Sequence, residues 1–193
     1  PDGLVTGVQT CALPILTGIY AEEYIAENII RPLGMANTYF TVPEELHSSV
    51  CLANEEDTEI FERVHDRRSY PPRTGGGLYS TLADVWKLGQ MMLNKGFFNG
   101  QRIVSRKSVE LMTRNQLTGV KAHYWGMSLN DFPMGIGWQL RPKGELVSPG
   151  TFFHEGASRC GLYVDPAEEF VAVFMVPAAK GNKDSMINPL AVM

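Results

Sequence analysis

The sequence has little of three things that would mark a specialised class of protein. Its 193 residues include three cysteines, Cys11, Cys51 and Cys160, too few and too scattered for a disulfide framework or a zinc site. Basic residues are not in excess, because 17 Lys and Arg face 21 Asp and Glu, so we expect no nucleic-acid partner. No apolar run reaches about eighteen residues, and we therefore expect no membrane-spanning segment.

Patterns for metal and phosphate binding are also missing. The histidines show no ligand spacing such as His-Glu-x-x-His, so we expect no metal. Gly75-Gly76-Gly77 is not followed by the Lys-Ser/Thr pair of a phosphate loop. We therefore expect no cofactor and interpret the three glycines as a turn that lets two backbones approach closely.

The first fifteen residues are expected to be foreign to the protein. Val5–Ile15 reads VTGVQTCALPI, which resembles the translation of a widely used short-read sequencing adapter. A signal peptide is a poor alternative, because no basic region precedes the segment and Gln9 and Pro14 interrupt it. We predict that residues 1–15 are an artifact and that residues 16–193 are the native part, the C-terminal part of one domain. An export signal would lie upstream, so the cellular compartment stays open.

Two helices carry clear signals at both ends. Ala21–Ile30 is rich in Ala, Glu and Ile and should end before Pro32, which disfavours helical angles at Arg31. A second helix should follow Thr81, which stands in capping-box spacing with Asp84, and should end near Gly96. Its predicted apolar face consists of Leu82, Val85, Trp86, Gly89, Met92 and Leu93.

Other segments predict loops first and strands later. Residues 43–65 are charged and weakly periodic, which indicates loop and short turns, and a short helix should follow Ser105 with Val109 and Met112 inward. Three short runs rich in aromatic and β-branched residues predict strands, the last two as an antiparallel hairpin: Gly135–Leu140, Cys160–Asp165 and Phe170–Val176. Helices followed by strands predict an α+β fold.

His154 is the histidine with the most suggestive context. It ends the apolar run Thr151–Phe153 and precedes Glu155 and Gly156, so it could present both an imidazole and a nearby backbone N–H to a ligand. A structural histidine is the simpler interpretation of these residues alone. Ser158 lacks the second glycine of a nucleophile elbow and is interpreted as an ordinary strand serine.

Several segments resemble, in order, those of the β-lactamase-related serine hydrolases. This family includes class C β-lactamases, D-alanyl-D-alanine carboxypeptidases and β-lactamase-fold esterases. The resemblance spans roughly residues 16–180 and implies an incomplete β-lactamase/transpeptidase-like fold with an antiparallel sheet and packed helices. The segments are Arg31–Met35 with Thr38, Gly75–Asp84, Met91–Asn94, Gly100–Ser105, His154–Gly156 and Asp165-Pro166.

The resemblance implies acyl transfer through an acyl-serine intermediate. In the family, the serine of a Ser-x-x-Lys motif attacks a carbonyl, while the lysine and the tyrosine of a Tyr-x-Asn motif move protons. The third motif lies on an edge strand and corresponds here to His154-Glu155-Gly156. The N–H after its glycine, on Ala157, would help form the oxyanion hole, and His154 would take the cationic or hydrogen-bonding position. The candidate catalytic residues are therefore His154, Gly156 and Ala157.

The nucleophile itself is absent from the sequence. No serine is followed three residues later by lysine, and no tyrosine is followed by x-Asn. The family's Tyr-x-Asn motif would stand shortly before Thr17-Gly18, where the adapter-like segment is. The family's closing helix would begin near residues 189–193, where the chain ends. We therefore expect a fragment that folds marginally and is inactive by itself.

Glu155 bears on the substrate. The family often has Thr or Ser at this place, whose hydroxyl binds a substrate carboxylate, whereas two carboxylates repel. If Glu155 points into the cleft, neutral esters should fit better than β-lactams or D-amino-acid peptides; strand alternation could instead direct it to solvent. The expected partner is one such small molecule. A non-catalytic β-lactamase-like binding protein is the alternative function, and an unrelated structural α+β domain is a weaker one.

Overall fold

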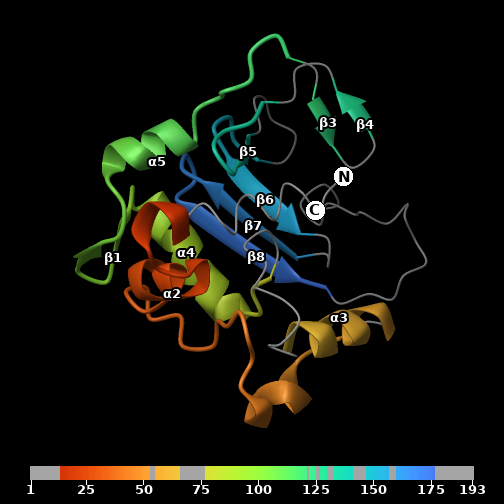
Figure 1. Ribbon diagram of the computed structural model, residues 1–193. Coiled ribbons are helices and arrows are strands. Elements are labelled where there is room, and N and C mark those ends of the chain that lie inside the picture. Colours follow the sequence, from red (N-terminus) through yellow and green to blue (C-terminus); the bar gives the residue numbers. More distant parts are fainter. Residues whose placement is uncertain are drawn as a thin grey trace. The chain divides into compact units, whose positions relative to one another are not determined.

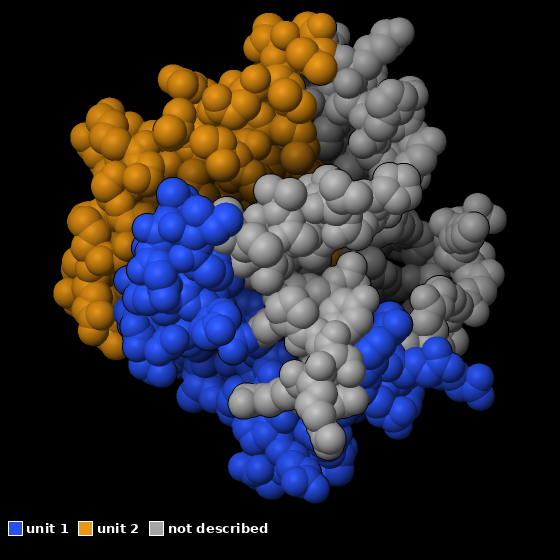
Figure 2. Space-filling model, viewed as in Figure 1, with its two compact units in different colours: residues 1–85, 176–181 blue, residues 86–175, 182–193 orange. Residues whose placement is uncertain are grey.

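The computed structural model describes residues 14–52, 55–65, 77–120, 122–124, 127–129, 133–140, 147–156 and 160–176. Most helices precede the antiparallel sheet strands, which confirms the predicted α+β class (Figure 1). The chain forms two compact units, which Figure 2 colours separately: unit 1 is residues 1–85 and 176–181, and unit 2 is residues 86–175 and 182–193. The foreign origin predicted for residues 1–15 concerns a segment that lies almost wholly outside the described residues.

The first predicted helix is present in two consecutive pieces, α2 (Ala21–Ile25) and the π-helix η1 (Ala26–Ile30). The predicted end at Ile30 is confirmed, but the predicted reason is wrong, because Arg31 keeps helical angles (φ −64°, ψ −48°). The N–H of Arg31 donates to the carbonyl of Ala26 over 2.9 Å. Pro32, the next residue, has no N–H to donate. Helical hydrogen bonding nevertheless continues past Pro32, because the N–H of Leu33 donates to the carbonyl of Ile29 over 3.0 Å. The chain leaves the helix at Gly34, which has φ +64° and donates its N–H to the carbonyl of Arg31 over 2.9 Å.

The prediction of loop and short turns for residues 43–65 is wrong for residues 55–65. The segment contains the 3₁₀ helix η2 (Glu44–Ser49) and the eleven-residue helix α3 (Glu55–His65). Phe61 of α3 is buried, and its ring meets the rings of His47 and Tyr79 edge-on at centroid distances of 4.9 and 5.4 Å. The helix is amphipathic, since Ile60, Phe61 and Val64 are spaced as on one helical face, but charged residues dominate the segment and led to the loop prediction.

Helix α4 (Leu82–Leu93) confirms the second predicted helix. The N–H of Asp84 donates to Thr81 Oγ1 over 3.3 Å, which is one half of the predicted capping box. At the other end, Gly96 has φ +89° and donates its N–H to the carbonyl of Met91 over 2.8 Å. The left-handed end predicted at Gly96 begins one residue earlier, at Lys95, which has φ +54° and donates its N–H to the carbonyl of Met92 over 3.0 Å.

The predicted apolar face of α4 is only partly right. Gly89 and Met92 are buried, but Leu82 and Trp86 are exposed, and Met91, which was not assigned to that face, is buried. The Trp86 ring instead lies edge-on to Phe98 at 6.5 Å. Phe98 belongs to a two-stranded hairpin that follows the helix, made of β1 (Phe97–Phe98) and β2 (Gln101–Arg102).

Helix α5 (Arg106–Met112) confirms the short helix predicted after Ser105. Ser105 caps it, because its Oγ accepts the N–H of Ser108 over 2.9 Å. Val109 is buried, as predicted, while Met112 is half-buried. A second hairpin, β3 (Ala122–Tyr124) and β4 (Met127–Leu129), comes after it.

Four antiparallel strands form the main sheet in the order β5-β6-β7-β8. Strand β7 (Cys160–Asp165) matches its predicted bounds, and β8 (Phe170–Met175) ends one residue early; together they form the predicted hairpin. The remaining strands are β5 (Gln139–Leu140) and β6 (Phe152–Gly156). On the sheet face bearing Leu162, α4 packs closely: a Cβ at Gly89 would lie 2.7 Å from Leu162 and 2.6 Å from Val171.

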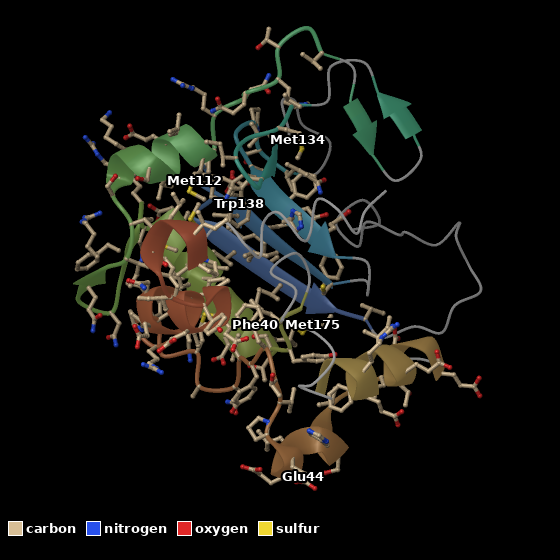
Figure 3. The ribbon with its side chains drawn as sticks, viewed as in Figure 1. Phe40, Glu44, Met112, Met134, Trp138 and Met175 are labelled. Carbon is tan, nitrogen blue, oxygen red and sulfur yellow. The ribbon has the colours of Figure 1, made fainter. Side chains whose placement is uncertain are left out.

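The strand predicted over Gly135–Leu140 is wrong for its first four residues. Residues 135–138 form a turn in which the N–H of Gly135 donates to the carbonyl of Trp138 over 2.7 Å and Gly137 has φ +76°. The N–H of Ile136 donates to the carbonyl of Met112 over 2.9 Å, which holds the turn at the end of α5. Figure 3 labels Met112 and Trp138 in this region.

Candidate functional site

The candidate residues His154, Glu155 and Gly156 are consecutive on β6. They pair with Leu162, Gly161 and Cys160 of β7, respectively. Successive side chains on a strand point to opposite faces, so His154 and Glu155 lie on opposite sides of the sheet. Ala157, the predicted oxyanion donor, and Ser158 lie outside the described residues, as do Gly75 and Gly76.

The His154 side chain is exposed, yet its pKa is lowered. Loss of hydration near the strand surface disfavours the charged imidazolium, whereas the negative charge of Glu155 acts in the opposite direction. The first effect is the larger one. Because the ordinary pKa of 6.5 is lowered, His154 is mostly uncharged at pH 7.

The half-buried Glu155 carboxylate has a partner on the neighbouring strand. The hydroxyl of Tyr163 donates a hydrogen bond to Glu155 Oε1. Tyr163 is 2% exposed and stands diagonally across from Glu155, since it pairs directly with Phe153. The carboxylate is therefore held on the sheet face that does not carry His154.

Gly156 lies against a thiol. A Cβ at this position would lie 2.7 Å from Cys160 Sγ, whose residue pairs with Gly156 across the two strands. Cys160 is a free, half-buried cysteine. Burial raises the pKa of its thiol, and backbone hydrogen bonds involving Gly156 and Cys160 oppose this in part. The thiol is therefore protonated at neutral pH and acts as a packing group.

In the described part of the chain, the other edge of β6 has no paired strand beside the candidate residues. Strand β5 pairs with Phe152 and Phe153, and the chain turns away before Gln139. Within the described ranges, no strand pairs with 154–156 on that side. An edge strand exposes backbone donors and acceptors to a ligand.

In unit 1, a buried carboxylate joins two of the segments that carry the family resemblance. Asp84 of α4 is 2% exposed and its Oδ2 accepts the N–H of Asn37 over 2.7 Å and the hydroxyl of Thr38 over 3.1 Å. The hydroxyl of Thr38 also lies 2.7 Å from Ser80 Oγ. These hydrogen bonds give the motif residues a structural role, because a buried carboxylate needs such donors.

The part of the chain that the structure describes holds no cluster of three or more His, Cys, Asp or Glu side chains suited to a metal ion. Its helices are also too short or too polar to cross a membrane.

The sequence model of the β-lactamase family matches residues 7–192. The chain belongs to the β-lactamase family. This confirms the resemblance seen in the sequence motifs. The matched range begins inside residues 1–15, and the foreign origin of that segment stays a prediction.

Curated relatives in the β-lactamase family are distant. A protein of Escherichia coli O157:H7 with the provisional name D-alanyl-D-alanine carboxypeptidase is 25% identical over 187 aligned residues, and its counterpart in strain K12 is 24% identical. The alignments cover 83% of this chain. The chain spans 40% of the length of these relatives.

Solved structures confirm the β-lactamase-like fold. EstCE1, a hydrolase with promiscuous acyltransferase activity, has a TM-score of 0.72 at 18% identity, covering 98% of this chain and 54% of its own. A β-lactamase from Mycobacterium bovis has a TM-score of 0.65 at 21% identity, covering 92% and 56%. A family VIII carboxylesterase has a TM-score of 0.61 at 19% identity, covering 84% and 47%.

Sequence reasoning missed Tyr163 and Cys160 as neighbours of the candidate site. Tyr163 lies eight residues after Glu155 in a separate strand, so only the pairing register brings the two together. The sequence predicted the hairpin of β7 and β8. It did not predict the register of β6 on β7, because the residues that connect these two strands carry no two-residue turn signature.

Proposed function

We propose that the protein from which this chain comes hydrolyses esters or amides through an acyl-serine intermediate, with a preference for esters. In this proposal the chain supplies the oxyanion side of the site: Ala157 donates its N–H to the developing oxyanion, and Gly156 lets the backbone approach the substrate. The edge of β6 beside 154–156 carries the proposal: no strand pairs with it among the described residues, and a carbonyl substrate can align there with backbone donors.

His154 takes the place that the family gives to a cation or a hydrogen-bonding group. Its lowered pKa supports the second role at pH 7, where a neutral imidazole can donate from one nitrogen and accept at the other. It would then take part in the proton network around the nucleophile as a neutral hydrogen-bonding group.

The replacement of the family's hydroxyl by Glu155 supports neutral esters over carboxylate-bearing substrates. The family's hydroxyl at this position is replaced by a carboxylate that already accepts a hydrogen bond from Tyr163. While ionised it cannot donate to a substrate carboxylate, so the hydroxyl that binds such a group in the family has no replacement at this position. β-Lactams and D-amino-acid peptides both carry such a carboxylate and should therefore be poorer substrates.

By itself the chain should be inactive, because its sequence has neither Ser-x-x-Lys nor Tyr-x-Asn. The test is covalent labelling with a fluorescent fluorophosphonate and with labelled penicillin. We expect no labelling of this chain, and labelling at the Ser-x-x-Lys serine of a longer polypeptide that carries the native upstream sequence. Stoichiometric labelling of the chain would contradict its inactivity. Upstream motifs without the serine would instead support the non-catalytic binding protein.

The substrate preference is tested in the same longer polypeptide. We expect faster turnover of a neutral short-chain ester than of penicillin or a peptide ending in D-alanine. A faster reaction with either carboxylate-bearing substrate would contradict the preference while leaving the acyl-serine mechanism in place.

A further inference from the structure

A side-chain hydrogen bond links Tyr163 of β7 to Glu155 of β6, and the pairing register of the two strands explains it. Gly161, the residue directly opposite Glu155, has no side chain, and the ring of Phe174 packs over it, so that a Cβ at Gly161 would overlap that ring. Diagonal neighbours on antiparallel strands are within reach of long side chains. The Glu155 carboxylate therefore extends past Gly161 to the hydroxyl of Tyr163, which donates to it.

Aromatic packing holds the ring of Tyr163 in place independently of its hydrogen bond. It stacks on the ring of Phe153 with centroids 4.8 Å apart and an interplanar angle of 5°, and the ring of Phe174 lies 6.0 Å away on its other neighbouring strand. Phe153 is 3% exposed, so this stack belongs to the core. Because this ring is packed against its neighbours, the hydroxyl of Tyr163 has a defined position from which it binds the half-buried carboxylate of Glu155.

The anchored carboxylate is next to the end of β6. Glu155 directly precedes Gly156, and Gly156 is the last residue of the strand. On its β5 side, this end has no pairing strand in the described part of the chain. Holding the end of β6 in place therefore depends on its contacts with β7, and the Tyr163–Glu155 hydrogen bond is a side-chain contact of that kind.

We propose that Tyr163 is a positioning residue for the candidate site: its hydroxyl tethers Glu155 to β7 and so fixes the end of β6 that carries Gly156. The relevance of this tether to substrate rests on the proposed function, in which Gly156 and Ala157 belong to the oxyanion side. The tether also keeps the Glu155 carboxylate on the sheet face opposite His154, which limits the negative charge facing a substrate beside His154.

The thiol of Cys160 reports on this end of β6, because Cys160 pairs with Gly156 and is half-buried against it. The experiment measures the rate at which Cys160 reacts with a disulfide reagent in a Cys11→Ala/Cys51→Ala background. Tyr163→Phe keeps the ring stack and removes only the hydroxyl. We expect it to speed the reaction about tenfold, the effect of losing one hydrogen bond to a charged group.

Local loosening and general destabilisation differ in their response to urea. Opening confined to the end of β6 exposes little surface, so the acceleration should persist unchanged at low urea concentrations. Tyr39→Phe is the matched control, because it also removes a phenol hydroxyl with a hydrogen bond, the one to the carbonyl of Ala36. We expect this control to react at the background rate. An acceleration that rises steeply with urea, or a Tyr163→Phe rate within about twofold of the background, would overturn the tether.

A double-mutant cycle tests whether Tyr163 acts through Glu155. Glu155→Ala should accelerate the thiol reaction to a similar extent, and Tyr163→Phe/Glu155→Ala should react no faster than either single variant, because both remove the same bond. Independent, multiplying effects would overturn the proposal. These measurements need no turnover, so failure of the labelling and turnover tests would remove the proposed function without altering the outcome for the tether.

Discussion

At Gly156 a side chain has no room while Cys160 stands opposite. A Cβ would lie 2.7 Å from Cys160 Sγ, and the next atom lies 3.9 Å away. We expect Gly156→Ala to lower the free energy of unfolding by about 1–3 kcal/mol, as overpacking does. In Gly156→Ala/Cys160→Ala most of this loss should be recovered, because the clashing sulfur is gone. Urea unfolding of the two single variants and the double variant measures it, and additive effects would contradict the clash.

His154 and Glu155 are coupled by charge although their side chains lie on opposite faces. The pKa of His154 is lowered from 6.5 mainly by loss of hydration, and the charge of Glu155 partly restores it. We expect an NMR titration of the His154 ring to have its midpoint below 6.5, and Glu155→Gln to lower it further. A His154→Gln spectrum assigns the signal. A midpoint that stays the same or rises in Glu155→Gln would contradict this coupling.

Residue types at the candidate site could be predicted from the sequence, but their surroundings could not. The family resemblance selected His154-Glu155-Gly156 as candidates and implied that they lie on a strand, whereas these residues alone favoured a structural histidine. The side chain of Glu155 could face a ligand or a neighbouring residue. Which of the two it faces depends on the alternation of side chains along β6 and on which residue of β7 lies beside it. That residue, Tyr163, is selected by the register, a long-range property with no local sequence signal.

Helix α4 packs against the sheet at Gly89, a residue without a side chain. Alanine normally favours a helix over glycine by about 1 kcal/mol. At Gly89, however, a Cβ would lie 2.6 Å from Val171 and 2.7 Å from Leu162. We expect Gly89→Ala to destabilise the protein, because the clash outweighs the helix propensity. Thermal unfolding measures this, with Lys87→Ala on the same helix as the control, and a raised melting temperature for Gly89→Ala would contradict it.

Elements with strong end signals were predictable, and those held by a few long-range contacts were not. Ser105 and Gly96 marked the boundaries of α5 and α4 because capping is a local interaction. Helix α3 was missed because its stability depends on Phe61 packing against rings from other segments. The rotated face of α4 has the same origin, since Trp86 covers the β1–β2 hairpin instead of entering the core.

At the scale of the molecule, His154 and Asp165 are described groups that make stability decrease as the pH falls. The lowered pKa of His154 means that the unfolded chain binds this proton first, so stability is lost from about pH 6.5 downward. For Asp165, burial raises the pKa, but hydrogen bonds from Ser148, Glu168 and Ala167 outweigh it and lower it below 3.8. Its stabilisation is present above pH 3.8 and is lost below that value.

Urea unfolding across the pH range tests this dependence. We expect His154→Gln to flatten the decrease just below pH 6.5 and Asp165→Asn to flatten the decrease below pH 3.8. Each variant should leave the other region unchanged, because the two groups titrate in separate ranges. If His154→Gln altered only the region below pH 3.8, the assignment of the upper region to His154 would be wrong.

The hydrogen bond between Tyr163 and Glu155 also has a consequence for how such sequences diverge. A half-buried carboxylate at position 155 is tolerable while a phenol at position 163 donates to it. A lineage that loses the phenol first would carry an unsatisfied acid on the sheet until position 155 also changes. Among homologues these two positions should therefore covary, with an acidic residue at 155 accompanied by tyrosine at 163 and a small hydroxyl residue at 155 free of that requirement.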